Sequence, residues 1–214
     1  MGKDINKTKF SKETKLKVDI FAEYLKEWLP VFLYTKYNDQ LYIYDYFAGS
    51  GMDINGEYGS PLALLNQTIA YCKDIHRSNK QLYFLFNEIS PIKINQLTQN
   101  VSKFLEQCKS KRPYNNCCFL EQSIKFSSDD FSNIFNQKDC LSILSNSKIA
   151  KFIILDQYGF SEIDNKIFLK LVSAPLTDFI FFISSSFVRR FKEHSSVTKY
   201  FDTKSIKFDE KKPE

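Results

Sequence analysis

Apolar and polar residues recur along the chain with two different spacings, one typical of helices and the other of strands. In some segments apolar residues return at steps of three and four, which places them on one face of a helix. Elsewhere short continuous apolar runs stand between polar segments, as in strands that are buried on both faces. These spacings predict helices over 13–33, 61–78, 91–109, 129–145, 164–173 and 187–200. They predict strands over 41–47, 82–86, 117–120, 152–156 and 179–184, with one more candidate over 203–208.

This alternation predicts an α/β fold with a Rossmann-like, doubly wound, mostly parallel sheet and helices on both faces. Ser60 and Pro61 support the second helix, because a capping hydroxyl followed by proline favours a helix start. We expect a Lys-rich segment with its helix over 1–35 and the Rossmann-like domain over 36–214. Since little follows the final candidate strand, we also expect a fragment of a longer protein or an irregular last sheet edge.

Composition and charge exclude several classes of protein. The 214 residues, 43% of them hydrophobic, suit one globular domain. No apolar run reaches the roughly 18 residues that span a bilayer, and no signal peptide begins the chain. The net charge of +5 lies in the two ends, residues 1–17 and 189–214, where a solvated tail explains it as well as nucleic-acid binding does.

The few cysteines and histidines argue against a metal centre. The five cysteines form no CxxC pair, and His76 and His194 have no partners at metal-binding or catalytic spacing. We therefore expect neither a disulfide framework nor a metal site, and we expect a cytoplasmic location. The Cys117-Cys118 pair is expected to fill a buried strand.

Glycine gives the most informative pattern. The chain has six glycines, and Gly49, Gly51, Gly56 and Gly59 fall within eleven residues directly after the first predicted strand. Glycine allows a sharp turn and a close approach of backbone to ligand. Because ligands of open α/β sheets lie beyond the carboxyl ends of the strands, this cluster predicts a ligand-binding loop.

Three known ligand loops compete for this segment. In the dinucleotide fingerprint Ile54 would replace the third glycine, and the next strand-ending acid, Glu88, comes 39 residues after Gly49 rather than about 20. In the P-loop Glu57 would stand where the phosphate-binding lysine must be. The S-adenosylmethionine loop of methyltransferases, an acid followed by Phe-x-Gly-x-Gly, fits without a mismatch. The residues that fit it are Asp45, Phe47, Ala48, Gly49, Ser50 and Gly51.

The charge of S-adenosylmethionine suits this loop. The cofactor carries a sulfonium and an ammonium group, which Asp45 attracts, and Glu88 after the second strand is placed to accept the ribose hydroxyls. The alternative is structural: the glycines turn the strand into a loop, and the two acids cap helices. The joint occurrence of strand, acid and glycine pair favours the cofactor.

A second candidate site follows the fourth predicted strand, at Asp156-Gln157-Tyr158-Gly159. Methyltransferases that act on base amino groups place Asp/Asn-Pro-Pro-Tyr/Phe here, where the acid accepts an amino hydrogen and the ring stacks on the extruded base. Asp156 and Tyr158 are the candidate catalytic residues. A helix cap at Asp156 is an equally good explanation.

Two other charged clusters have simpler explanations. Asp129 and Asp130 are candidates for contact with an adenine ring, although capping the following helix suits them better. Arg189, Arg190 and Lys192 are candidates for phosphate contact, but a solvated helix face is the default.

Taken together, these motifs resemble the three-Cys-motif partner protein family (TcmP) over nearly all of the chain. The resemblance rests on the following segments: Thr14-Lys15 with Tyr24-Leu25 and Trp28, residues 44–51, Gly59-Ser60-Pro61, Phe86-Asn87-Glu88, and Asp156-x-Tyr158-Gly159. Gln157 departs from the family, which usually has proline after this acid.

The resemblance implies a class I methyltransferase-like fold and a partner protein. Family members are usually encoded beside a radical-SAM-like protein with three cysteines, often near phage or mobile defence genes. The leading hypothesis is thus an S-adenosylmethionine-dependent methyltransferase whose acceptor is a nucleic-acid base amino group. The alternatives are a non-catalytic partner subunit that keeps the fold and, third, a dinucleotide-dependent enzyme.

Overall fold

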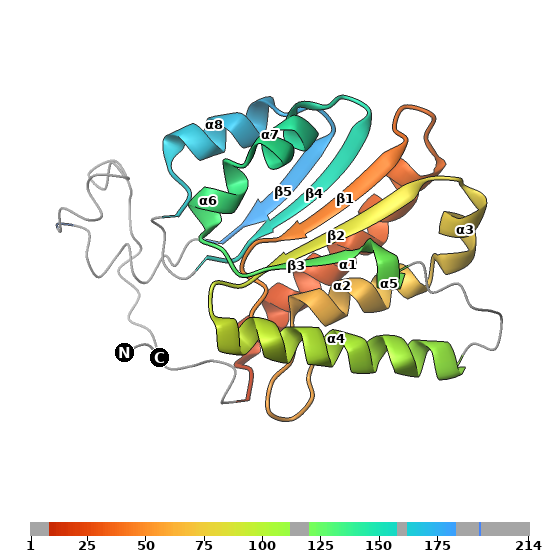
Figure 1. The fold of residues 1–214 in the computed structure, drawn as a ribbon, viewed down its shortest axis with the longest axis vertical. Coiled ribbons are helices and arrows are strands. Elements are labelled where there is room, and N and C mark those ends of the chain that lie inside the picture. Colours follow the sequence, from red (N-terminus) through yellow and green to blue (C-terminus); the bar gives the residue numbers. More distant parts are fainter. Residues whose placement is uncertain (1–8, 112–119, 158–161, 183–192, 194–214) are drawn as a thin grey trace.

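The computed structural model describes residues 9–111, 120–157, 162–182 and 193 (Figure 1). The helices are α1 (Lys12–Tyr34), α2 (Ser60–Ile69), α3 (Cys72–Arg77), α4 (Pro91–Lys111), α5 (Leu120–Ser123), α6 (Phe131–Phe135), α7 (Lys138–Ser145) and α8 (Asn165–Ser173). The strands are β1 (Gln40–Asp45), β2 (Gln81–Asn87), β3 (Ile124–Ser127), β4 (Ile149–Leu155) and β5 (Thr177–Phe181).

The five described strands form one parallel sheet in the order β3-β2-β1-β4-β5 (Figure 1). The chain builds outward from β1 to β3 and then crosses back to β4, so the strand order reverses between β1 and β4. Asp45 at the end of β1 lies in register between Phe86 of β2 and Ile154 of β4. The prediction of an α/β fold with a parallel sheet is confirmed.

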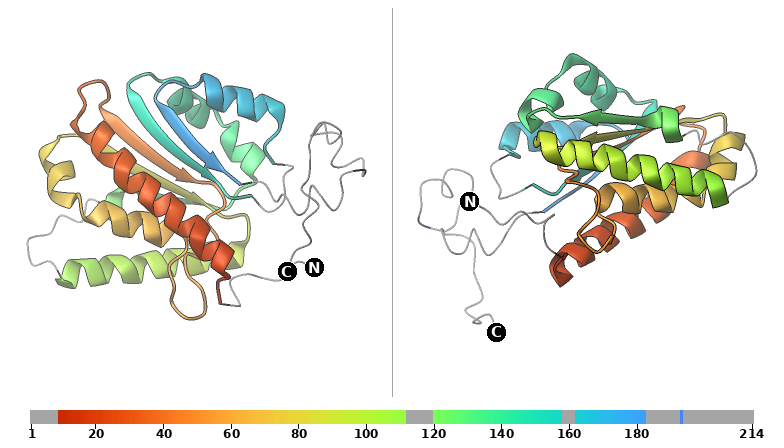
Figure 2. Two further views of the ribbon diagram at one scale, coloured as in Figure 1. Left: turned by 180° about the vertical axis from the view of Figure 1, so that it is seen from behind. Right: turned by 60° about the horizontal axis from the view of Figure 1, so that its bottom comes forward.

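Helices cover both faces of this sheet (Figure 2). Helices α1, α2 and α4 pack on one face, and α6, α7 and α8 pack on the other. Side chains alternate between the two faces along each strand. In β1, Ile43 packs with the first group of helices and Tyr44 with the second. Every residue of β4 is buried, including Lys151, and its apolar run over 152–155 was readable in the sequence.

Helix α1 belongs to the core of the sheet. The Ser11 side chain caps it by accepting a hydrogen bond from the Thr14 N–H at 3.2 Å. Its buried stripe includes Phe21, Leu25 and Leu29, which pack on the sheet face that α2 and α4 also cover. The predicted helix over 13–33 is confirmed within a residue at each end.

Two predicted helices are each divided in two. The helix predicted over 61–78 ends at Ile69, and α3 begins at Cys72, because a tight turn places hydrogen bonds from Ala70 and Tyr71 three residues back. The helix predicted over 129–145 is interrupted at Gln137, whose ψ of 142° is not helical. Of the two aspartates expected to cap this helix, Asp130 caps its first half.

The third strand was predicted in the wrong place. The structure begins helix α5 at Leu120, and the strand beside β2 is Ile124–Ser127. This four-residue edge strand is only partly buried and exposes Lys125, so it lacks the continuous apolar run that marks a central strand. Residues 117–119, including the cysteine pair, lie outside the described residues. So do the elements predicted over 187–200 and 203–208.

None of the described helices is long and apolar enough to cross a membrane.

Candidate functional site

Three acidic residues lie at the carboxyl-terminal edge of the sheet. Asp45 ends β1, Glu88 directly follows β2, and Asp156 directly follows β4. These three strands are adjacent and parallel, and the strand order reverses between β1 and β4. Such a reversal point is where open α/β sheets bind ligands.

The glycine-rich loop after β1 folds tightly against itself. Gly49 and Gly51 have φ values of 62° and 84°, a left-handed conformation that favours glycine. The Gly59 N–H donates to the Gly51 carbonyl at 2.7 Å. A Cβ atom on Gly59 would lie 3.2 Å from that carbonyl, so the contact depends on two glycines approaching each other.

Helix α4 packs against this loop. The Asn100 side chain donates to the Ser50 carbonyl at 2.9 Å. A Cβ atom on Gly51 would lie 2.6 Å from Cδ1 of Leu97. Neither α4 residue was predicted, because a leucine and an asparagine on an amphipathic helix carry no signal of what they contact.

Glu88 contacts the glycine loop directly. Its Oε2 accepts a hydrogen bond from the Gly49 N–H at 3.1 Å, and its Oε1 accepts one from the Ser90 N–H at 2.9 Å. The predicted loop and the predicted second acid therefore meet. The bond from the Ser90 N–H also holds the chain just before α4. Glu88 therefore stabilises the start of a helix as well, which was the structural alternative to cofactor binding. Each oxygen retains capacity for a further hydrogen bond.

Asp45 is a fully buried carboxyl group with one unpartnered oxygen. Its Oδ1 accepts a hydrogen bond from the Phe47 N–H at 3.2 Å, and its Oδ2 has no hydrogen-bond partner among the described residues. Burial raises the pKa of Asp45 to about 7, opposed by the Phe47 N–H and the nearby Ser60 side chain. The nearby carboxylates of Asp156 and Glu88 also raise the pKa of Asp45, by less than burial does.

The remaining loop side chains are turned toward the protein. The Phe47 ring packs 5.2 Å from the ring of Phe131 in α6, and Ala48 is buried. Ser50 is also buried, and its hydroxyl donates to the Met52 carbonyl at 2.9 Å. These residues shape the loop through packing, so contact with a ligand here would come mainly from the loop's backbone.

Asn87 is a buried residue that the sequence analysis named only as part of a motif. Its side-chain nitrogen donates to the carbonyls of Tyr46 and Asp129, and its side-chain oxygen accepts from the Asp129 N–H at 3.2 Å. Its own carbonyl accepts from the Ala48 N–H at 2.9 Å. One asparagine thus links the segments that follow β1, β2 and β3.

Asp156 makes an ion pair that the sequence analysis did not foresee. The Lys17 ammonium in α1 lies 2.6 Å and 2.5 Å from its two carboxylate oxygens. Lys17 lies on the same helix face as Phe21 and Leu25. A lysine on an apolar stripe could have indicated a buried acidic partner. Tyr158 and Gly159 lie outside the described residues.

Gln157, which stands where the resembled motif usually has proline, has a structural role. Its side chain is buried, and Oε1 accepts a hydrogen bond from the Glu162 N–H at 3.0 Å. The residue therefore ties β4 to the chain before α8 instead of presenting its amide at the surface.

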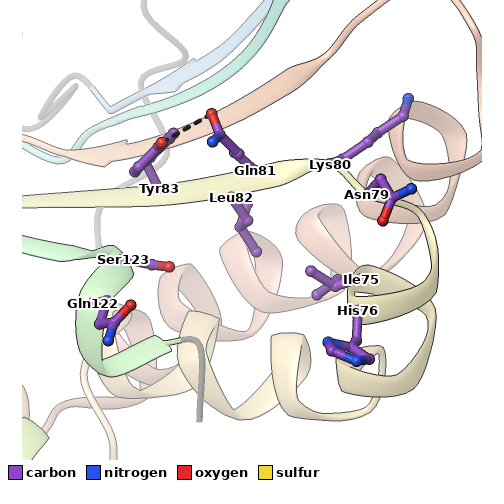
Figure 3. A pocket seen from close by; sticks show the side chains of 9 residues that line it. All are labelled: Ile75, His76, Asn79, Lys80, Gln81, Leu82, Tyr83, Gln122 and Ser123. Atoms are coloured by element: carbon purple, nitrogen blue, oxygen red, sulfur yellow. Dashed lines mark hydrogen bonds between the residues drawn. The ribbon is translucent and has the colours of Figure 1, made fainter. Parts of the chain in front are cut away.

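Two cavities in the described structure lie at the opposite, amino-terminal edge of the sheet. One of about 390 Å³ lies beside the start of β2 and is lined by His76, Lys80 and Gln122, among others (Figure 3). The other, of about 450 Å³, lies between the ends of α7 and α8. The Lys80 ammonium donates to the Phe32 carbonyl at 2.7 Å, so it serves the end of α1. Neither cavity includes the glycine loop or the three acids. The geometry of that loop makes the acidic edge the candidate site.

Within the described residues, no group of three or more His, Cys, Asp or Glu side chains is arranged to hold a metal ion. His76 is exposed, and His194 lies outside the described residues. Asp130 caps α6, while Asp129 accepts hydrogen bonds from the Asp130 N–H and the Asn133 side chain.

Comparison with known proteins adds no relative: no protein-family model, no curated protein and no solved structure matches this chain.

Proposed function

We propose that the chain binds S-adenosylmethionine at the acidic edge of the sheet and is a methyltransferase-like protein. One observation carries the proposal: the N–H of Gly49 and the carboxylate of Glu88 are in hydrogen-bond contact at 3.1 Å. The contact brings together a left-handed glycine turn after β1 and an acid after β2, the two parts that a nucleoside-containing ligand needs from this edge.

The residues present fit the cofactor's charge. S-adenosylmethionine supplies a methyl group on a sulfonium and needs no phosphate site. Asp45 offers a buried, unpartnered oxygen, and Glu88 adds a negative charge at the same edge. In the proposed complex the backbone of Gly49 and Gly51 approaches the cofactor, Glu88 accepts the ribose hydroxyls, and Asp45 stabilises the positive charge.

The protein's contribution to methyl transfer is alignment, because the leaving group is already activated. The acceptor class we propose is an exocyclic amino group of a nucleic-acid base. Asp156 would accept a hydrogen of that amino group, and Tyr158 would stack on the base.

Calorimetric titration with S-adenosylmethionine tests this proposal. The intact chain should bind it, and binding should be lost in Gly49→Arg, which adds a long side chain and a positive charge at a φ of 62°. Asp45→Ala should weaken binding by removing the buried carboxylate.

Gly56→Asn is the matched control for this titration. Gly56 has a φ of 80° in the same loop but no atom within 4 Å of a built Cβ, and asparagine tolerates that conformation. This variant should bind like the intact chain. If the intact chain shows no heat of binding, the proposal is overturned.

A second candidate function has its own supporting observation. Because Lys17 engages both oxygens of Asp156, the residue proposed to face the methyl acceptor already has a partner. This favours a non-catalytic subunit that keeps the fold and serves a partner, for which the family resemblance suggests the three-cysteine radical-SAM-like protein. Cofactor binding without methyl transfer to DNA, RNA or protein extracts would favour this function over the first.

A further inference from the structure

The Lys17 ammonium is held by two groups of different kinds. Both carboxylate oxygens of Asp156 accept from it, and it lies 5.4 Å from the centroid of the Phe182 ring. Phe182 directly follows β5, and its N–H donates to the Leu155 carbonyl at 3.2 Å, which fixes it beside the end of β4. A carboxylate and an aromatic face are the two elements with which proteins recognise ammonium and sulfonium cations.

This ion pair is less exposed than the other ion pairs that α1 makes within the described residues. Lys15 pairs with Glu57 at 3.0 Å, and those two side chains are 36% and 51% exposed. Lys26 pairs with Glu23 one turn away, and both side chains are largely exposed. The Lys17 pair joins residues 139 positions apart, and the side chains of Lys17 and Asp156 are only 29% and 24% exposed. An exposed pair within one helix contributes little to stability, whereas a partly buried pair holds one ammonium at a defined place.

The position of this ammonium matters for the acidic edge. Asp156 is close enough to Asp45 to contribute to the rise in its pKa, so the carboxylate that holds Lys17 belongs to the same environment as the candidate ligand loop. A cation that approached this edge would meet Asp156 with Lys17 already bound to it.

We propose that Asp156 and Phe182 form a binding site for an alkylammonium or sulfonium group, and that Lys17 occupies it as an internal substitute until such a ligand displaces it. The identity of the natural cation rests on the proposed function, which offers S-adenosylmethionine with its two cationic groups, the sulfonium and the ammonium. Displacement would free the Lys17 side chain from the end of β4, while the buried stripe of α1 stays packed on the sheet.

The test uses two small probes, trimethylsulfonium and n-butylammonium, titrated into the full chain and followed by NMR. With an internal competitor, the apparent association constant equals the intrinsic one multiplied by the fraction of molecules in which the site is free. Removing it in Lys17→Met should therefore tighten binding of both probes about tenfold or more. Lys26→Met, which removes an ammonium from the same helix, should bind them as the unaltered chain does.

The double variant Lys17→Met/Asp156→Asn should lose the gained affinity, because the carboxylate is then absent. The proposal is overturned if Lys17→Met binds the probes no better than the unaltered chain, or if the double variant keeps the gain.

A measurement on the unaltered chain covers the case in which Lys17→Met does not fold. Acylation by an N-hydroxysuccinimide ester, read by mass spectrometry, reports how free each lysine is. Trimethylsulfonium should increase labelling of Lys17 and leave labelling of Lys26 unchanged. Equal labelling of Lys17 with and without the probe contradicts displacement.

Tighter binding of S-adenosylmethionine in Lys17→Met assigns the cofactor to this site. A larger gain for trimethylsulfonium than for n-butylammonium then assigns its sulfonium, and the opposite order assigns its ammonium. If the probes bind but S-adenosylmethionine binds to no variant, the cation site stands and the proposed function fails. If S-adenosylmethionine binds the intact chain but no variant gains affinity for the probes, the reverse holds.

Discussion

At the scale of single residues, the loop after β1 contains two glycines with similar backbone angles and different surroundings. Gly51 and Gly56 have φ values of 84° and 80°. A Cβ on Gly51 would collide with the Leu97 side chain at 2.6 Å, whereas one on Gly56 would meet nothing within 4 Å. The pair therefore separates the cost of backbone strain from the cost of overpacking.

We expect Gly56→Ala to lower the free energy of unfolding by about 1–2 kcal/mol, the cost of placing a side chain in the left-handed region. Gly51→Ala should cost a further 1–3 kcal/mol or so from crowding against Leu97. Urea denaturation of both variants measures the difference. Leu97→Val should recover part of the loss in Gly51→Ala, and equal losses at the two glycines would contradict the collision.

Asp45 makes a prediction about pH. Its pKa is about 7 in the folded chain, against an ordinary value of 3.8. Between those values the folded state keeps a proton that the unfolded state has lost, so folding gains stability from the protonated group. That contribution is fully present below pH 3.8 and is lost as the pH rises through about 7.

Asp45→Asn cannot ionise and should not show this loss. Its free energy of unfolding relative to the unaltered chain should therefore rise between pH 4 and pH 7, by up to roughly 4 kcal/mol. Urea denaturation at pH 4, 5, 6, 7 and 8 measures it. Asp39→Asn, at the exposed opposite end of β1, controls for the loss of one carboxylate. Parallel pH profiles for Asp45→Asn and the unaltered chain would show that Asp45 does not titrate in this way.

At the scale of elements, Asn87 holds together the ends of three strands. Its side chain satisfies two carbonyls and one N–H from the segments after β1 and β3. Such groups cost free energy when they are left buried without partners.

Asn87→Ala should therefore destabilise the chain by about 2–4 kcal/mol, more than the roughly 1 kcal/mol expected for Asn100→Ala, which removes a single bond to Ser50. Thermal or urea unfolding of the two variants compares them. The Ala48 N–H donates to the backbone carbonyl of Asn87, and its hydrogen exchange should quicken as the strand ends loosen. A loss of stability in Asn87→Ala no larger than that in Asn100→Ala would contradict the linking role of Asn87.

At the scale of the whole molecule, two cores share one sheet. Trp28, the only tryptophan, packs on the α1 face, while Ile153 of β4 packs on the α6–α8 face. Because both cores are built on the same strands, we expect them to unfold together.

Ile153→Ala should lower the free energy of unfolding by about 2–5 kcal/mol, as large-to-small changes at buried positions do. The denaturation midpoint followed by Trp28 fluorescence should fall as far as the midpoint followed by far-ultraviolet circular dichroism. An unchanged Trp28 midpoint would mean that the two faces unfold separately.

Elements with a regular local pattern of burial were predictable without any structure. The stripe of α1 gave boundaries within one residue, and the apolar run over 152–155 located β4, although the strand begins three residues before the predicted start. Burial on one face or on both imposes a period that can be read residue by residue. The glycine cluster after β1 and the acids Asp45 and Glu88 were likewise found from strand ends alone.

Contacts between distant elements depend on tertiary packing and were not predictable from local patterns. The edge strand β3 was misplaced because partial burial leaves no continuous apolar run. The contact of Leu97 with Gly51, the links made by Asn87 and the pairing of Lys17 with Asp156 join positions 39 or more residues apart, or lie on helix faces whose neighbours no spacing reveals. The period of a sequence fixes the face on which a side chain lies, and the packing of distant elements fixes what that side chain contacts.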